Sequence, residues 1–474
     1  MSSERLAMLD HFRVPYGVDP SLAAGALQQI RCRDEDRALM WMRTPDLPAV
    51  AATLPGADGK VEIPLFATVV GDDEVQAQLA RFGDQWSRAR TIVASDGTPL
   101  GSIWRSKDGS VFLPFDPCEV VENFWSERYL TIGAGSAPRL LRRVLMLLYY
   151  RARPLLGRPV QIWLRRGFAR LQARSRFPRW PVETCLQDFF DLMFAILSGI
   201  AGRAIPRIAA WPTDYQWALV LSHDVEQADG FAALEPVLEL ERRHGMRSSW
   251  NLVPRRYPID PERVQQLLDD GFEVGVHGLH HDGRDLESLA LWEERLPHAY
   301  EAAAQWGGVG FRSAALHRDW DRMRELRFDY DSSIPDTDPF EPQDGGCCSW
   351  LPFFNGGVIE LPLTLPQDHT LFVILRQRDE TAWVQKAEFL RARGGLAMID
   401  THPDYLVDQS IFRAYSRFLD RFCSDTTAWK ALPREVSAWW RRRAASWIEH
   451  DGEGWRVFGP AADEARVELE WRSW

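Results

Sequence analysis

The chain of 474 residues carries a formal net charge of −11, with 45% hydrophobic and 26% charged residues. This composition is typical of a soluble globular protein of about three domains. The acidic balance argues against nucleic acid as the main partner, because nucleic-acid binding favours a basic surface. The six cysteines include no Cys-x-x-Cys pair, and the N-terminus lacks the pattern of a signal peptide. We therefore expect reduced thiols and a cytoplasmic location.

Residues 1–135 are expected to form a smaller N-terminal α/β domain of unknown role. Residues 61–70 and 91–94 have the pattern of strands, and residues 73–81 have the pattern of a helix. The sequence shows no cluster of catalytic residue types in this part.

Residues 136–210 are expected to form an arginine-rich helical connector. Between residues 138 and 180 there are twelve arginines and no Asp or Glu, with apolar residues at helical spacing among them. Such a helix can lie on an anionic membrane or pack on the acidic remainder of the protein, and both alternatives stay open. The first would place the protein peripherally at the inner membrane face, in contact with anionic lipid or a lipid-linked saccharide.

Residues 211–410 show apolar strands that alternate with helices. Residues 217–221 form a continuous apolar run, as expected of a parallel strand buried on both faces. Further strands are expected at 248–252, 272–276, 310–313, 358–362 and 395–400. Helices are expected at 235–243, 261–270 and 286–306. Repeated βα units predict a parallel barrel or open sheet. Residues 411–474 are expected to add a C-terminal helix and a β-like tail.

Carboxylates and histidines follow three of the expected strands. Asp224 and Glu226 lie two residues apart, so in extended backbone their side chains point the same way. His277 and His281 have the i, i+4 spacing that zinc sites use. His402 follows the last strand. Because the strand ends of a barrel present catalytic side chains at one face, we expect these residues to share a site.

Two histidines and one carboxylate leave coordination positions open on a metal, as in catalytic rather than structural zinc sites. A bound metal lowers the pKa of water toward about 7 and polarises a carbonyl. A free carboxylate can take a proton from the water, and a histidine on the opposite side can protonate a leaving nitrogen. Each residue alone also has an ordinary structural interpretation, such as helix capping for the acids. Their combination predicts a metal-dependent hydrolase.

Four ordered motifs resemble those of the polysaccharide deacetylase family, carbohydrate esterase family 4, which includes chitooligosaccharide and peptidoglycan deacetylases. The motifs are Ser222-His223-Asp224-Val225-Glu226, His277-x-x-x-His281, Gly310-Phe311-Arg312-Ser313 and Ile399-Asp400-Thr401-His402. The resemblance covers roughly residues 215–408, and flanking segments look like a bacterial subgroup with an N-terminal extension. It implies a distorted (β/α) barrel of about seven strands.

The resemblance also implies roles for individual residues. Asp224 matches the catalytic base, His402 matches the general acid, and Arg312 matches the arginine that holds the base in place. An arginine beside Asp224 would keep its carboxylate ionised and would orient it. The residues that match the metal ligands are Glu226, His277 and His281. The cofactor we expect is a divalent metal, with zinc (Zn²⁺) as the first choice.

The sequence departs from the family pattern in three places. Glu226 stands where the family usually has Asp. The third motif lacks the tyrosine whose backbone N–H helps to hold the oxyanion, although Ala315 still has an N–H there. The usual fourth motif is not evident, and Asp368 and Asp400 are both candidates to support His402.

Three residues are candidates for contact with the substrate. They are His317, Asp368 and Ala315. For His317, a surface or packing role is an equal alternative.

The function we expect is removal of an acetyl group from an N-acetylated sugar or saccharide. One alternative is hydrolysis of another C–N bond, such as a cyclic amide in an allantoinase-like protein. A narrow, capped pocket would favour this alternative, and an open groove lined by tryptophans would oppose it. A second alternative is a non-catalytic carbohydrate-binding protein. The altered third and fourth motifs permit it, and the intact set of acid, base and metal ligands argues against it.

Overall fold

The computed structural model describes residues 6–18, 27–31, 37–42, 47–82, 85–132, 157–173 and 177–474. The chain divides into two compact units, neither of which is continuous in sequence. The first unit comprises Met1–Ser136, Thr184–Ala209 and Arg442–Trp474. The second comprises Ala137–Glu183 and Ala210–Arg441. Helix α6 (Cys185–Ala201), which we expected in the connector, therefore groups with the N-terminal residues.

The first unit is built on a mixed sheet with the strand order β1-β2-β3-β8-β7-β6-β4-β5. Its strands are β1 Gly17–Val18, β2 Leu27–Arg31, β3 Ala38–Met42, β4 Val50–Pro55, β5 Glu62–Ala67, β6 Trp86–Ala94, β7 Pro99–Ser106 and β8 Val111–Leu113. Its helices include α1 Ala7–Phe12, α2 Asp72–Leu79 and α3 Pro117–Trp125. The expected strand at 61–70 and helix at 73–81 are β5 and α2.

Short strands complete the first unit. Strand β9 (Ile205–Ile208) pairs with β21 (Val467–Glu470), and β19 (Trp447–His450) pairs with β20 (Trp455–Phe458). The β-like tail that the sequence indicates at 454–474 thus contributes two of these four strands, β20 and β21.

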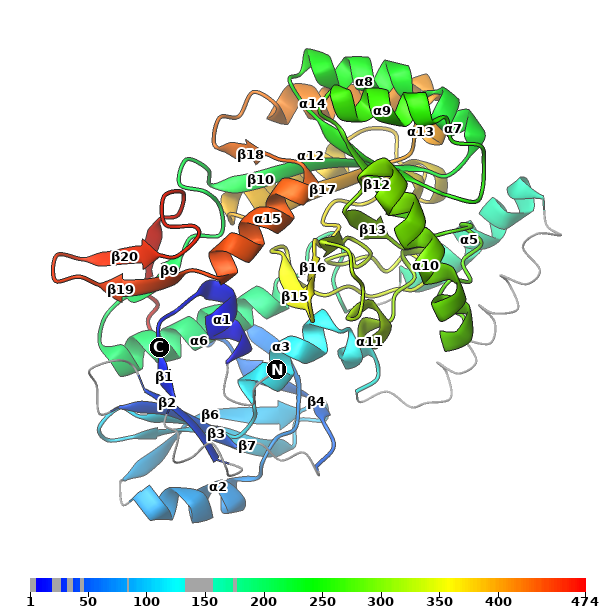
Figure 1. Ribbon diagram of the computed structural model, residues 1–474. Helices are drawn as coiled ribbons and strands as arrows, with labels where there is room; N and C mark the ends of the chain where they lie inside the picture. The colour runs from blue at the N-terminus through cyan, green and yellow to red at the C-terminus, as the bar shows by residue number, and fades with distance from the viewer. Residues whose placement is uncertain are drawn as a thin grey trace. The chain divides into compact units, whose positions relative to one another are not determined.

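The second unit contains a curled sheet of parallel strands in the order β16-β14-β13-β12-β11-β10-β17 (Figure 1). Strand β15 adds an antiparallel edge beside β16, and β18 also pairs with β10. The bounds are β10 Trp217–Val225, β11 Ser248–Leu252, β12 Glu273–His277, β13 Gly310–Arg312, β14 Tyr330–Asp331, β15 Phe353–Asn355, β16 Val358–Glu360, β17 Leu396–Thr401 and β18 Ala428–Lys430. All residues of β10 are buried, as its continuous apolar run predicts.

The two ends of the parallel sheet are joined by loop backbone. Among the described residues no pairing connects β16 to β17. The segment after β16 lies between them instead: the Leu363 N–H donates to the Ile334 carbonyl (3.0 Å), and the Leu365 N–H donates to the Met398 carbonyl in β17 (2.9 Å). The mixed α/β class and the barrel-like curl are as expected, and the number of strands expected for a closed barrel stays a prediction.

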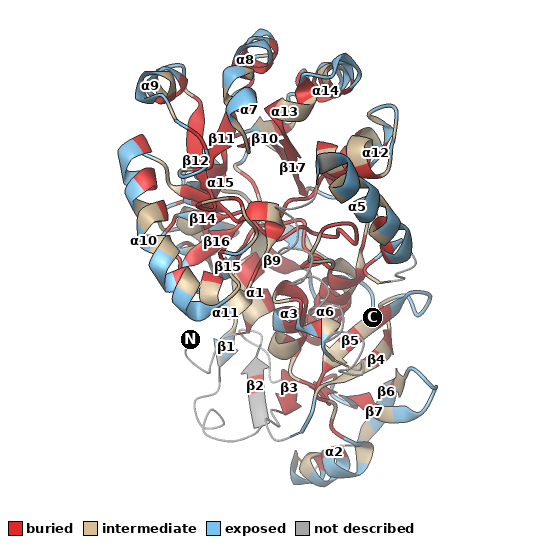
Figure 2. Ribbon diagram, turned by 90° about the vertical axis from the view of Figure 1, so that its right-hand side faces the viewer, coloured by how far each residue is buried: buried red, intermediate tan, exposed pale blue. Residues whose placement is uncertain are grey.

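Helices cover the outside of this sheet. They include α8 Leu234–Arg243, α9 Pro261–Asp269, α10 Leu289–Trp306, α12 Thr381–Ala392 and α14 Gln409–Phe422. Shorter helices are α7 Ala228–Ala232, α11 Trp320–Met323 and α13 Pro403–Leu406, and α15 spans Pro433–Ala444. Helix α9 begins where the Asp260 carboxylate accepts from the Glu262 N–H (3.0 Å), with Pro261 in the first turn. Figure 2 shows these helices exposing one side and burying the other against the strands.

Helix α5 (Arg158–Gln172) is the helical part of the arginine-rich segment that the structure describes. The Arg166 guanidinium donates to the Val373 carbonyl (2.8 and 3.0 Å), and the Gln172 side chain donates to the Glu341 carbonyl (2.9 Å). Helix α5 therefore packs on the rest of the second unit. The apolar residues between 140 and 148, whose helical spacing is part of the expected connector, lie outside the described residues. Within the described part of the chain, every helix is too short or too polar to cross a membrane.

Candidate metal centre and active site

The register of the parallel strands brings the predicted site residues to one edge of the sheet. Asp224 in β10 lies opposite Asn251 in β11, and His277 in β12 lies opposite Arg312 in β13. On the other side of β10, Ser222 lies opposite Asp400 in β17. The carboxyl ends of parallel strands meet at the same edge, so residues far apart in sequence become neighbours.

Glu226, His277 and His281 form a cluster suited to a divalent metal. Each offers one ligand atom, and the three atoms lie within 4.8 Å of one another. The His281 Nε2 lies 2.9 Å from Glu226 Oε1, and the two imidazole rings are 4.9 Å apart between centroids. Both histidines are buried, and among the described residues no hydrogen bond of good geometry reaches His281 Nε2. Two imidazoles and a carboxylate that converge in this way fit a zinc ion with open positions.

A second cluster of possible ligands, Asp224, Asp400 and His402, fits a cation less well. The Arg312 guanidinium already donates to Asp224 Oδ1 (2.9 Å) and to Asp400 Oδ1 (2.7 Å). A divalent ion there would lie against a fixed positive charge that already neutralises the carboxylates. The geometry therefore favours the cluster with Glu226.

The turn that carries the second histidine uses left-handed backbone. Gly278 has φ +60° and His281 has φ +51°. A Cβ on Gly278 would lie 2.7 Å from Asp285 Oδ2, and Asp285 is held by Arg295 at 2.6 Å. The i, i+4 spacing is thus realised in a tight loop. Strained left-handed backbone at a non-glycine residue is often found at functional sites.

Asp224 is held by one carboxylate oxygen and leaves the other free. Its Oδ1 accepts from Asn251 Nδ2 and from Arg312 Nη1, both at 2.9 Å. Its Oδ2 is buried without a hydrogen-bond partner among the described residues, 3.5 Å from His277 Nε2. Burial alone would raise the pKa of Asp224, but the charges of Arg312, His277 and His402 outweigh it and lower the pKa to about 2. The carboxylate is therefore ionised.

Arg312 is itself fixed by buried partners. Besides the two aspartates, its Nη2 donates to Ser222 Oγ (3.0 Å), and its Nε donates to the Ser332 carbonyl (3.1 Å). The side chain is fully buried. A planar guanidinium held in this way leaves Asp224 little freedom to turn.

His402 lies at the end of β17, where helix α13 begins, and it pairs with Asp368. Its Nδ1 is 2.6 Å from Asp368 Oδ1, and its backbone N–H donates to Asp368 Oδ2 (2.8 Å). Its Nε2 lies 3.6 Å from Glu226 Oε1 and 3.9 Å from Asp400 Oδ2. Burial alone would lower the pKa of His402, but the carboxylates of Asp368, Asp400 and Glu226 hold it well above its usual value. Asp368 is therefore its main partner.

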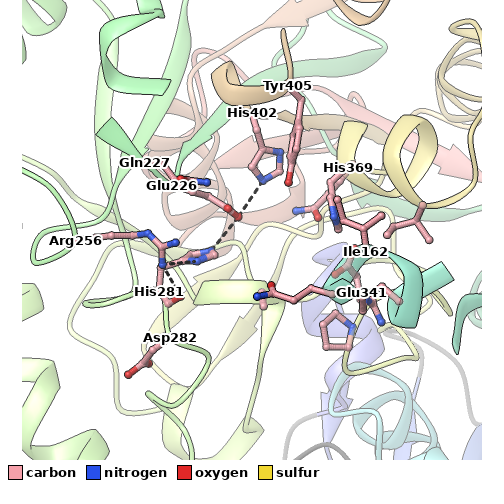
Figure 3. Close-up of a pocket in the computed structure, with 16 residues that line it drawn as sticks. Ile162, Glu226, Gln227, Arg256, His281, Asp282, Glu341, His369, His402 and Tyr405 are labelled. Atoms are coloured by element: carbon pink, nitrogen blue, oxygen red, sulfur yellow. Dashed lines mark hydrogen bonds and ion pairs between the residues drawn. The ribbon is translucent and has the colours of Figure 1, made fainter. Parts of the chain in front are cut away.

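A cavity of about 480 Å³ opens beside these residues (Figure 3). Glu226, His281 and His402 line it, whereas Asp224 and His277 are buried behind them. The other lining residues are polar or small for the most part: Gln161, Ile162, Arg165, Gln227, Arg256, Asp282, Ala315, Glu341, Pro342, Gln367, His369, Ile374 and Tyr405. No tryptophan is among these described lining residues.

The three residues expected to contact substrate take different places. Ala315 lines the cavity and has φ +56°. Asp368 stands behind His402 and does not line the cavity. His317 is likewise absent from the described lining residues, and its carbonyl accepts from the Ser313 hydroxyl.

Several residues of the site were not expected from the sequence. Asn251, which holds Asp224, is the residue before the last in the strand expected at 248–252, so its place near the strand end was a usable signal. Arg256, which donates to the His281 carbonyl (2.9 Å), comes from the loop after that strand. Helix α5 supplies Gln161, Ile162 and Arg165 to the cavity wall, and no local pattern in the sequence signals this.

Comparisons with known proteins give the following. No protein-family model and no curated protein matches the chain. Solved structures do match, at low identity and over about half of this chain. A Mycobacterium smegmatis protein assigned as a polysaccharide deacetylase shares 17% identity over 49% of this chain and 93% of its own, with a TM-score of 0.41.

Two further solved structures have similar coverage. An allantoinase, Puue, shares 15% identity over 48% of this chain and 91% of its own (TM-score 0.41). A family 4 carbohydrate esterase from Streptomyces lividans, in complex with acetate, shares 15% identity over 45% of this chain and 91% of its own (TM-score 0.31). The matched structures thus include polysaccharide deacetylases of the family that the four sequence motifs resemble.

Proposed function

We propose that the protein is a metal-dependent hydrolase that removes an acetyl group from an N-acetylated sugar or small saccharide. One observation supports this most directly. Glu226, His277 and His281 converge on one point, and the free Oδ2 of an ionised Asp224 lies 3.5 Å from one of these ligands. A binding protein would have no use for a buried, ionised carboxylate that keeps one oxygen free beside a metal-binding cluster.

The chain's own residues would divide the work of amide hydrolysis. A divalent metal bound by Glu226, His277 and His281 would polarise the acetyl carbonyl and lower the pKa of water. Asp224 Oδ2 would accept the proton that the attacking water loses. His402 would donate its proton to the amide nitrogen as the C–N bond breaks, which yields acetate and a free amine.

Two further groups would position this chemistry. Arg312 and Asn251 hold Asp224 Oδ1 and so turn Oδ2 toward the metal ligands. The backbone N–H of Ala315, which lines the cavity, is the candidate donor to the developing oxyanion.

The cavity favours a small substrate. Its volume of about 480 Å³ lies in the range of ordinary small-molecule sites, which span about 300–1,000 Å³. Helix α5 forms part of its wall, and no tryptophan platform for a long glycan lines the described part of it. A cavity enclosed in this way also fits a second candidate function, which is hydrolysis of a C–N bond in another small molecule such as a cyclic amide.

The test is acetate release from a panel of N-acetylated mono- and disaccharides by protein reloaded with zinc after chelation. Asp224→Asn should keep the metal and lose about 10²–10⁴-fold in turnover, the range of general acid–base catalysis. His281→Ala should lose metal and activity together. His298→Ala is the matched control, because His298 lies on the outside of α10 and should leave both unchanged.

Two results would contradict the proposal. Full activity of the Asp224→Asn variant would show that Asp224 is not the catalytic base. Ring opening of cyclic amides without acetate release from any sugar would favour the second candidate.

A further inference from the structure

Helix α5 has two faces with different surroundings. On one face, Gln161, Ile162 and Arg165 line the candidate active-site cavity. The other face carries an exposed apolar stripe: Val160 (47% exposed), Leu164 (37%), Leu171 (59%) and Trp163 (71%). At 3.6 residues per turn these four side chains fall within about 100° of the helix circumference. Figure 2 shows α5 largely exposed.

Exposed large apolar side chains are more concentrated on α5 than on the rest of the second unit. Seven large apolar side chains of its described residues are exposed, and four of them lie on α5. The other three, Leu289, Phe354 and Val407, lie on separate elements or loops. Single exposed apolar residues are ordinary, whereas a contiguous stripe marks an interaction surface.

The charge beside the stripe indicates what covers it. Helix α5 has four arginines and no Asp or Glu, in a chain whose net charge is −11. Arg165 lines the cavity and Arg166 donates to the Val373 carbonyl, whereas the exposed Arg170 lies next to Trp163 on the helix circumference. A second copy docked through the same face would bring two cationic helices together, which is unfavourable. An anionic lipid surface offers both an apolar layer for the stripe and negative headgroups for Arg170 beside it.

We propose that α5 docks the second unit on the surface of an anionic bilayer, and that the cavity behind α5 receives a saccharide carried by a lipid of that bilayer. The helix of 15 residues would lie in the plane of the membrane, about 22 Å long at 1.5 Å per residue. Trp163 suits the boundary between headgroups and acyl chains, because its indole has an apolar body and a polar N–H. The proposed membrane contact depends only on the exposed side chains and charge of α5. The proposed lipid-linked substrate depends in addition on the proposed function.

The first experiment is flotation of the full chain with phosphatidylcholine vesicles that contain or lack phosphatidylglycerol, at low and high salt. We expect binding only to the anionic vesicles, and weaker binding at high salt. Arg170→Gln should weaken binding about fivefold, since one basic residue near an anionic surface contributes about 1 kcal/mol. The double variant Trp163→Ser/Leu171→Ser should weaken it at least tenfold. Trp447→Ser is the matched control, because this tryptophan is 47% exposed in the first unit and should not matter.

The second experiment separates docking from the proposed function. Acetate release is measured on a soluble N-acetylated sugar and on an N-acetylglucosaminyl lipid in the anionic vesicles. The double variant should keep its activity on the soluble sugar and lose most of its activity on the lipid. Vesicle binding without acetate release from any substrate would support the docking and overturn its link to deacetylation.

Three results would overturn the docking itself. The first is absence of vesicle binding at every salt concentration. The second is equal binding by the double variant and the unchanged protein. The third is a change in oligomeric state of the double variant, measured by light scattering, in place of a change in vesicle binding, because it would show that a second copy covers the stripe.

Discussion

Asp224 and His402 carry opposite charges because of the groups that surround each of them. Arg312 and the nearby histidines stabilise the carboxylate of Asp224, whereas Asp368 stabilises the protonated imidazole of His402. Burial alone opposes both charges, but it also strengthens the interaction with each oppositely charged neighbour, because few water molecules screen it. One site can therefore hold a base and an acid at the same pH, which is what amide hydrolysis needs.

The partner of His402 gives a prediction at this scale. Asp368→Asn removes the carboxylate that holds the proton on His402, so its pKa should fall. We expect acetate release to fall about 10²-fold with the zinc content unchanged. The alkaline limb of the pH–rate profile should move to lower pH, because the general acid would lose its proton earlier. Metal analysis and a pH series would check this.

Asp463→Asn, an exposed change in the first unit, is the control for Asp368→Asn. An unchanged pH profile for Asp368→Asn would show that Asp368 only holds the loop in place.

At the scale of elements, strands fix some ligands and turns fix others. His277 ends β12, whereas His281 depends on the turn that follows. That turn needs left-handed backbone at Gly278, and it packs against Asp285 with no room for a side chain. The geometry of the metal cluster is therefore sensitive to residues that touch no metal.

Gly278→Ala tests this dependence. A left-handed alanine costs about 1–2 kcal/mol, and its Cβ would also lie 2.7 Å from Asp285 Oδ2. We expect zinc affinity, measured by competition with a chelator, to fall about 10–100-fold, as for other changes behind metal ligands. Gly245→Ala is matched in backbone, with φ +67° and open space around it, and should lose stability without losing zinc. Equal zinc affinity in both variants would contradict the prediction.

At the scale of the whole molecule, each unit is assembled from separate stretches of the chain. In the first unit, the buried Arg443 guanidinium donates to the carbonyls of His11, Ala209 and Ile208 at 2.7–2.8 Å. One side chain thus joins the N-terminal, middle and C-terminal segments of that unit. All the candidate catalytic and metal-binding residues lie in the second unit.

Arg443→Met should therefore separate stability from activity. Three buried carbonyls would lose their donors, and we expect the free energy of unfolding of the first unit to fall by about 3 kcal/mol. Urea unfolding would measure this, and acetate release by folded protein should persist. Arg434→Met on the same helix, where the side chain is exposed, is the control. Loss of zinc binding in folded Arg443→Met would contradict the independence of the site.

Most of the strands and helices of the second unit could be predicted from the sequence. The apolar runs at 217–221 and 395–400 became β10 and β17, because strands buried on both faces need continuous apolar residues, and the strand expected at 248–252 is β11. The role of α5 could not be predicted. Its arginines and apolar residues suit either packing or a membrane, and only the fold shows which side chains face the cavity.

The sequence by itself determined which chemical groups stand at strand ends. Asp224, His277 and His402 each follow or end an apolar run, and this depends only on the order of residues along the chain. Tertiary structure alone decided which of them touch, and which neighbours set their charge. Asp368, not Asp400, became the main partner of His402, and Asn251 came to hold Asp224. These contacts join segments remote in sequence, and such contacts depend on how the whole chain packs, which no local pattern records.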